Sequence, residues 1–344
     1  MAYTTIDKST DYFNTVLYAG NGSSNAITGV GFQPDWIWLK NRSTNNSHQL
    51  YDAVRGTTKY LESDNADSEY TSSDGISAFG SDGFTIAGNL TGANNSSNNF
   101  VSWNWLGANG TASNSNGSIT STVSANTTSG FSIVSYTGTL GNATVGHGLG
   151  VAPKVIFIKC RGTGARSWVV YHDSIGNTKH LTLSETDAAA TSSASFNNTS
   201  PTSSVFSLGT SNNANDSTTM IAYCFAEKKG FSRFSSYVGN GSSDGSFIYL
   251  GFKPAWFMLK SISGEGWNMY DNKRLGYNER NDQILANTNG AEQDTSAWRL
   301  DLLSNGVKIR GNDSGVNGSG TTYIYMAFAE NPFVTSTGIP TTAR

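Results

Sequence analysis

The four histidines of this chain are its first candidates for chemistry, because histidine changes charge near neutral pH. They are His48, His147, His172 and His180. His172 is followed by Asp173, but neighbouring residues of a strand point to opposite faces, so the two side chains do not easily share a site. The two matching segments elsewhere in the chain have no histidine at this position. We therefore interpret His172 as a surface or rim residue and predict no catalytic residue.

Carboxylates are the second group of candidates, because a glycosidase needs two acids flanking the sugar bond. They gather in two matching polar loops, SDNADSE and SETDA, and comprise Asp64, Asp67, Glu69, Glu185 and Asp187. The first loop also suggests a calcium site, since hard cations take oxygen ligands, but it lacks the ordered ligand series of an EF-hand. The sequence has no CxxC pair, HExxH motif, Walker loop or dinucleotide fingerprint. We interpret these acids as loop residues and expect neither a bound metal nor a cofactor.

Two tryptophans and one histidine hold matching positions and are the remaining candidates for binding. Trp168 and Trp267 each stand three residues before a repeated tyrosine, at the place that His48 takes in the first copy. Sugars stack on exposed aromatic rings, so these three residues could contact a glycan or a partner. Equivalent positions also suit a shared packing role at the edge of a sheet, and we favour packing.

These candidates belong to an internal repeat. Three similar segments end in lysine: GFQPDWIWLK at Lys40, GVAPKVIFIK at Lys159 and GFKPAWFMLK at Lys260. Each copy has one tyrosine before this segment, a second tyrosine after it and an aromatic run at its end. The tyrosines are Tyr18, Tyr136 and Tyr237, then Tyr51, Tyr171 and Tyr270. A period of about 100 residues is that of a small domain rather than of a solenoid turn, so we predict three copies of one module.

Each copy contains short apolar runs rich in strand-forming residues, and no segment keeps a helical apolar stripe over three turns. In DWIWLK both alternating sets of residues are apolar, so we expect residues 35–40 to form a central strand covered on both faces. In the last run of the first copy Val101, Trp103 and Trp105 face one way and Ser102 and Asn104 the other, which predicts a half-exposed strand. We predict an all-β protein of three tandem antiparallel β-sandwich modules of the jelly-roll or lectin-like kind.

The repeat sets the expected domain boundaries. A lead-in covers residues 1–10, and the three modules cover 11–107, 130–229 and 230–330. The segment 108–129 between the first two modules is rich in Ser, Asn and Gly and forms either a flexible linker or a strand along a neighbour. The second and third modules follow each other without a linker and should form a rigid pair. The tail, residues 331–344, is expected to run extended over the surface.

Composition and charge exclude several classes of protein. Charged residues make up 14% of the chain and its net charge is −3, so it offers no basic face for nucleic acid. The sequence has no apolar run of 18 residues and no signal-peptide pattern at its N-terminus. We therefore expect no membrane insertion, and synthesis in a host cytoplasm. Cys160 and Cys224 both lie in apolar runs of the second copy, which predicts buried free thiols.

The motifs YxGNGSS, GFxPDWIWLKNRS, HQLYDAVRGTTKYL and SDNADSE, with FAENPF and GIPTTAR near the end, carry a family resemblance. The chain resembles repeat-bearing, lectin-like (jelly-roll or concanavalin-like) structural proteins of tailed bacteriophages, of the marine and cyanophage type. The likeness is greatest from Tyr18 to Glu69 and in the C-terminal 20 residues. VRGTTKYL becomes SIGNTKHL and RLGYNERN in the other copies, so a role tied to Arg55 or Lys59 is not expected beyond the first copy.

The resemblance implies a non-enzymatic virion structural protein that is exposed on the particle, as a tail fibre, a tail-associated protein or a capsid decoration. Its partners would be other virion proteins and host surface polysaccharide. Few charges protect the strand edges, so we also expect a homo-oligomer, with a homotrimer favoured over a monomer whose three copies form a pseudo-threefold body. A free carbohydrate-binding lectin is the alternative function, and a polysaccharide-degrading tailspike is a third.

Overall fold

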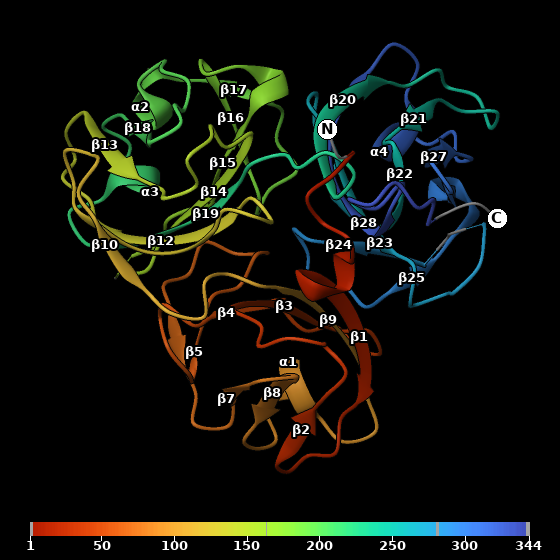
Figure 1. Cartoon of the computed structure of the whole chain (residues 1–344), viewed down its shortest axis with the longest axis horizontal. Helices are drawn as coiled ribbons and strands as arrows, with labels where there is room; N and C mark the ends of the chain where they lie inside the picture. Colours follow the sequence, from red (N-terminus) through yellow and green to blue (C-terminus); the bar gives the residue numbers. More distant parts are fainter. Residues whose placement is uncertain (1–2, 163, 280–281, 342–344) are drawn as a thin grey trace.

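The computed structural model describes residues 3–162, 164–279 and 282–341 (Figure 1). Within these ranges the protein is all-β: its paired strands are antiparallel, and its helical turns comprise at most four residues each. The prediction of an all-β fold with antiparallel sheets is confirmed. Figure 1 shows the three repeats as three bodies around a common centre, in red to orange, yellow to green and cyan to blue.

Each repeat contributes one larger sheet, and the three sheets have the same order of strands. The first sheet comprises, in spatial order, β1 (Phe13–Ala19), β9 (Asn99–Trp105), β3 (Trp36–Asn41) and β4 (Gln49–Asp52), and is continued through a bridge by β5 (Lys59–Tyr60) and β6 (Tyr70–Thr71). The second comprises β12 (Phe131–Thr137), β19 (Thr219–Phe225), β14 (Val155–Cys160), β15 (Val169–His172), β16 (Lys179–Thr182) and β17 (Ala190–Thr191). The third comprises β20 (Ser232–Val238), β28 (Thr322–Pro332), β22 (Phe252–Ser261), β23 (Trp267–Asp271), β24 (Asp282–Leu285) and β25 (Gln293–Asp294).

The strand register places the repeated residues at equivalent positions. The equivalent pairs are Trp36 with Trp105, Val155 with Phe225, and Trp256 with Phe328. Further along the same strands, the three repeated lysines pair with Val101, Ile221 and Ile324. Pro34 and Pro153 precede their strands, where a missing N–H costs no ladder bond, whereas Pro254 lies inside β22 at a shift in register. The three lysines therefore lie one residue before the ends of equivalent strands, as the sequence repeat predicts.

A smaller sheet covers the outer face of each larger one. The smaller sheets comprise β2 (Asn25–Ile27), β8 (Gly83–Ile86) and β7 (Ile76–Gly80); β13 (Ala143–Gly146) and β18 (Val205–Leu208); and β21 (Phe247–Tyr249), β27 (Gly306–Ile309) and β26 (Leu300–Leu303). An apolar cluster lies between each smaller sheet and its larger partner, which makes the arrangement sandwich-like. The cluster of the second repeat holds Cys160 and Cys224, which are buried free thiols as predicted.

The inner faces of the three larger sheets meet in one shared core. Trp105, Phe225 and Phe328 occupy the same register position in β9, β19 and β28. Their rings form a triangle whose centroid distances are 6.4, 6.0 and 5.7 Å. The repeats therefore surround a pseudo-threefold axis, and each repeat relies on the other two to bury its inner face (Figure 1).

Burial in the first repeat confirms one strand prediction and corrects another. All six residues of β3 are buried, with both tryptophans in the shared core and Ile37 and Leu39 in the outer cluster, as predicted. The prediction of a half-exposed β9 was wrong, because Ser102 and Asn104 are fully buried. The Asn104 amide donates to the carbonyls of Asn14 and Ser102, both at 3.1 Å, so hydrogen bonds within the sheet replace water at this face.

The segment 108–129 forms strands rather than a free linker. Its strands β10 (Ala112–Asn114) and β11 (Ser121–Asn126) add to the second larger sheet beside β12. This is the second of the two possibilities that the sequence left open. The larger sheet of the second repeat thereby gains two strands that the other repeats lack.

Phe225→Ala tests the shared core. Phe225 is 1% exposed and its ring contacts aromatic rings of all three repeats, so we expect the free energy of unfolding to fall by about 3–5 kcal/mol. The parent protein and the Phe225→Ala variant should each unfold in a single transition, because the repeats share one core. Urea unfolding followed by tryptophan fluorescence and circular dichroism measures both quantities. Tyr277→Ala, at a side chain that is 67% exposed, is the control; separate transitions for separate repeats would contradict the shared core.

Candidate functional site

The candidate residues of the sequence lie at the three interfaces between repeats, which we name 1–2, 2–3 and 3–1 after the repeats they join. His48, Trp168 and Trp267 make equivalent ring hydrogen bonds there. Each ring nitrogen bonds a backbone carbonyl of another repeat: Trp168 that of Glu62 (2.7 Å), Trp267 that of Thr182 (2.9 Å) and His48 that of Leu285 (3.0 Å). The three acceptors are equivalent by strand register. One hydrogen bond is thus repeated around the pseudo-threefold axis.

Burial assigns these three rings to packing. His48, Trp168 and Trp267 are each 2% exposed or less. A ring on which a sugar stacks must present an open face, and these rings have none. They contact neighbouring repeats of the same chain instead, in agreement with the packing interpretation.

Trp38 fixes the protonation of His48. The Trp38 indole N–H donates to Nδ1 of His48 at 2.8 Å, so the proton of the neutral ring is on Nε2, which donates to the Leu285 carbonyl. Burial lowers the pKa of His48 well below its usual range, and the charge of Lys40 acts in the same direction. His48 is therefore a neutral hydrogen-bond donor between two repeats, not a base facing a substrate.

The three repeated lysines form a second set of equivalent contacts. Each Nζ donates to a backbone carbonyl of another repeat: Lys159 to Ala66 (3.0 Å), Lys260 to Thr186 (3.0 Å) and Lys40 to Asn289 (2.9 Å). Additional carbonyls of their own repeats accept from them. Burial lowers the pKa of each lysine to about 8. The lysine that closes each repeated segment is therefore an inter-repeat contact, which its position at a strand end did not reveal.

Interface 1–2 contains a buried ionic cluster. Arg55 donates to Asp52 at 2.5 Å and to Glu69 at 3.2 Å, and Arg161 of the second repeat donates to Glu69 at 2.8 Å. The hydroxyl of Tyr223 donates to Asp52 at 2.7 Å. The side chains of Asp52 and Arg55 are fully buried, so each charge depends on the others for compensation.

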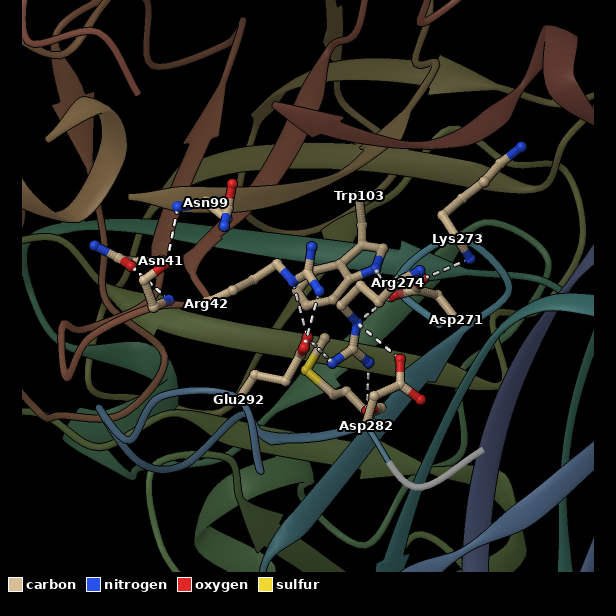
Figure 2. Close-up of polar contacts among 11 residues, drawn as sticks. Asn41, Arg42, Asn99, Trp103, Asp271, Lys273, Arg274, Asp282 and Glu292 are labelled. Atoms are coloured by element: carbon tan, nitrogen blue, oxygen red, sulfur yellow. Dashed lines mark hydrogen bonds and ion pairs between the residues drawn. The ribbon is translucent and has the colours of Figure 1, made fainter. Parts of the chain in front are cut away.

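Interface 3–1 contains the same cluster (Figure 2). Arg274 donates to Asp271 at 2.6 Å and to Glu292 at 3.0 Å, and Arg42 of the first repeat forms a two-bond pair with Glu292. Trp103 takes the place of Tyr223, with its indole N–H 3.1 Å from Asp271. Burial raises the pKa of Asp271, but the charge of Arg274 and the hydrogen bonds from Arg274 and Lys273 together lower it below its usual value, so the carboxylate stays ionised.

Interface 2–3 has the same backbone contacts, but apolar side chains and one neutral histidine replace the ionic cluster. One backbone hydrogen bond recurs at all three interfaces. The N–H of Glu69 donates to the Arg161 carbonyl at interface 1–2, that of Ala189 to the Ile262 carbonyl at interface 2–3, and that of Glu292 to the Arg42 carbonyl at interface 3–1. At interface 2–3 this bond joins Ala189 to Ile262, and Ile175 stands where the other repeats have arginine. His172 replaces the aspartate; its Nδ1 accepts from the Ser174 N–H, so Nε2 donates to the Tyr325 carbonyl at 3.2 Å. The prediction of a surface or rim His172 was wrong, because the side chain is fully buried.

The sequence carried a signal for the two ionic clusters that our alignment missed. Asp52 and Arg55 form a D-x-x-R pair, and Asp271 and Arg274 form a second one with the same spacing. Our alignment of the third copy was displaced by one residue, so the expectation that Arg55 has no counterpart was wrong: Arg274 makes its contacts. Glu69, interpreted as a loop acid, is the shared acceptor of interface 1–2.

Among the residues that the structure describes, no group of three histidine, cysteine or acidic side chains is placed to hold a metal ion. No helix in the described ranges is long and apolar enough to cross a membrane. What the interfaces can do chemically is bind repeat to repeat, through neutral rings, carbonyl-bound lysines and paired charges.

Residues 8–332 match the model of one protein family, described as a domain of unknown function (DUF7483), and the chain belongs to this family. The matched range begins before β1 and ends with β28. The family domain therefore spans all three repeats and the core that they share, not a single repeat. No curated protein and no solved structure matches the chain.

Transfer of the apolar interface tests the role of the charges. Glu69→Ala leaves Arg55 and Arg161 without their shared carboxylate, so we expect a loss of about 3–5 kcal/mol in the free energy of unfolding. A variant that carries the residues of interface 2–3 at interface 1–2 should recover most of this loss, because it removes the arginines together with the carboxylates and leaves none of them unpaired. Its substitutions are Asp52→His, Arg55→Ile, Glu69→Ala, Arg161→Ile and Tyr223→Met. Urea unfolding measures the free energy of unfolding of both variants. If the variant with the transferred interface is no more stable than Glu69→Ala, the equivalence of the interfaces is contradicted.

His172→Gln tests the neutral histidine by its effect on pH dependence. Burial lowers the pKa of His172 to about 4 from its usual 6.5. The unfolded chain then binds more protons than the folded protein between these values, so His172 makes the protein less stable as the pH falls from about 6.5 to 4. Glutamine keeps one donor and one acceptor, so the variant should match the parent at pH 7.5 and lose less stability at pH 5. Equal losses over this range, measured by urea unfolding, would show that His172 is not the group responsible.

Proposed function

We propose that the protein is a non-enzymatic structural protein of a bacteriophage particle, built of three tandem β-sandwich modules of the jelly-roll or lectin-like kind and exposed on the particle. The observation that carries the proposal is the shared core, in which the inner faces of all three larger sheets pack against one another. Such packing makes one rigid body and leaves the outer surface for partners. The assignment to a phage particle rests on the sequence resemblance of the repeats.

The state of the buried polar residues supports a structural role. His48 and His172 are neutral donors to carbonyls of other repeats, and Glu69 and Glu292 are each shared by two arginines. A catalytic acid or base must face a substrate, whereas these groups face each other across the interfaces. These buried polar groups therefore hold the repeats together.

Glu62 is the residue that best fits the alternative of a polysaccharide-degrading tailspike. Burial raises the pKa of its carboxyl to about 7, and Asn65 donates to it. A carboxyl that is protonated near neutral pH is what a general acid requires. Asn65 and Ser47 hydrogen-bond to this carboxyl, whereas the nearby carboxylates Asp64 and Asp67 raise its pKa further.

The partners that we propose are other virion proteins, with host surface polysaccharide as a second contact. For assembly we propose a homotrimer, because smaller sheets also end in edge strands other than β21, such as β7 and β26. A monomer is the alternative, since closure of the core within one chain means that no second copy is needed to bury the inner faces.

Immunogold labelling of intact particles tests the proposal. Antibodies raised against the purified protein should label phage particles from a culture that produces this chain, at one place on head or tail. In parallel, purified protein incubated with host surface polysaccharide should leave the chain length of the polysaccharide unchanged. Unlabelled particles would overturn the virion assignment, and depolymerisation that is lost in Glu62→Gln would identify a hydrolase.

A further inference from the structure

Within the part of the chain that the structure describes, the β21 strand has one open edge. It pairs with β27 on one side and ends the smaller sheet of the third repeat (Figure 1). Ile248 is 4% exposed and packs in the outer cluster, whereas Phe247 and Tyr249 are 47% and 55% exposed. Two large exposed aromatic side chains therefore flank one buried residue on a three-residue edge strand.

The other two repeats show that the fold does not require these aromatic residues. The edge strands β2, β13 and β21 can be aligned by their strand register. The alignment of β2 with β21 is also supported by two close approaches, of Gly83 to Ile27 and of Gly306 to Ile248. The positions of Phe247 and Tyr249 are taken by Ala26 and Thr28 in the first repeat and by Thr144 and Gly146 in the second. Packing of the smaller sheet therefore succeeds with small side chains, and the aromatic pair needs another explanation.

The second repeat shows what can bind such an edge. Its edge strand β13 is covered by an extended segment, residues 118–121, from the chain between the first two repeats. Ile119 pairs with Val145 in the parallel direction, and its N–H donates to the Thr144 carbonyl at 3.0 Å. The Ser121 hydroxyl donates to the Gly146 carbonyl at 2.7 Å. Ile119 is 8% exposed and joins the outer cluster, so the added segment closes this repeat.

The backbone of β21 offers the same bonding groups. Ile309 donates to the Ser246 carbonyl at 3.0 Å, and bonding alternates along an antiparallel pair. The N–H and C=O groups of Phe247 and Tyr249 therefore point away from β27, as those of Thr144 and Gly146 point away from β18. The third repeat follows the second at residue 230 with no intervening segment, so the junction between these repeats supplies no counterpart of residues 118–121.

We propose that the open edge of β21 binds an extended, uncharged strand of a partner polypeptide, in the parallel direction in which residues 118–121 bind β13. The partner strand would place a branched apolar residue beside Ile248, as Ile119 lies beside Val145, and apolar or aromatic residues beside Phe247 and Tyr249. Main-chain hydrogen bonds supply affinity and the alternate side chains supply specificity in this mode of recognition. The site rests on the geometry of β21 and does not depend on the assignment to a phage particle.

A fluorescent peptide with the sequence of residues 115–123, carrying Ser118→Phe and Thr120→Phe, is the probe. Fluorescence anisotropy should show saturable binding to the full chain. Phe247→Pro removes an outward N–H but no bond to β27, and should weaken binding by about tenfold or more. Phe247→Ala with Tyr249→Ala leaves the backbone intact and should weaken it by a similar factor. Ala26→Pro, at the equivalent position of the first repeat, is the matched control and should bind as the parent does.

Hydrogen exchange and light scattering complete the test. In the parent, the probe should slow exchange in the peptide fragments that contain Phe247 and Tyr249 and leave β2 unchanged. Absence of saturable binding up to about 1 mM, or binding that both β21 variants retain, would overturn the proposal. A dimer or trimer of the free protein that dissociates in the Phe247→Ala, Tyr249→Ala variant would show that a second copy of the chain occupies the edge, and would equally overturn it.

Discussion

The triangle of Trp105, Phe225 and Phe328 is the contact on which the rest of the structure depends. Each larger sheet is apolar on both faces, and its own repeat covers only the outer one. The inner face must be buried against something else, and three such faces satisfy each other around one axis. This explains why the family domain spans residues 8–332: a single repeat would leave its inner face in water.

Because the three repeats are fused in one chain, equivalent positions around the pseudo-threefold axis need not carry the same residue. A homotrimer of one module would place the same residue three times at the centre, whereas here one tryptophan and two phenylalanines share the space. The fused chain can vary each position separately. The same freedom appears at the interfaces, where two carry buried charges and one carries apolar residues.

Sequence patterns predicted the elements of this fold better than its contacts. The repeat, the two-faced central strand and the buried cysteines followed from residue type and period, because each depends on local burial. The burial of Ser102 and Asn104 did not, since small polar residues are common both in water and within sheets. The interfaces were also missed. Lys159 meets the loop of residues 66–67 only through the pseudo-threefold closure, and no spacing along one repeat encodes that contact.

The distribution of charge over the three interfaces follows the connections of the chain. The second and third repeats are joined directly at residues 229–230, so the chain itself holds interface 2–3 together at high effective concentration. The first and second repeats are joined through the longer segment 108–129, and interface 3–1 joins the two repeats that are furthest apart in sequence. Closure of a longer loop costs more entropy, and it allows more ways of docking the wrong faces.

Buried ion pairs add little net stability, but they penalise any register that leaves a charge unpaired. Among the described residues, these ion pairs are present at the two interfaces that the chain constrains least and absent at the one that it constrains most. A role in selecting the register requires this distribution.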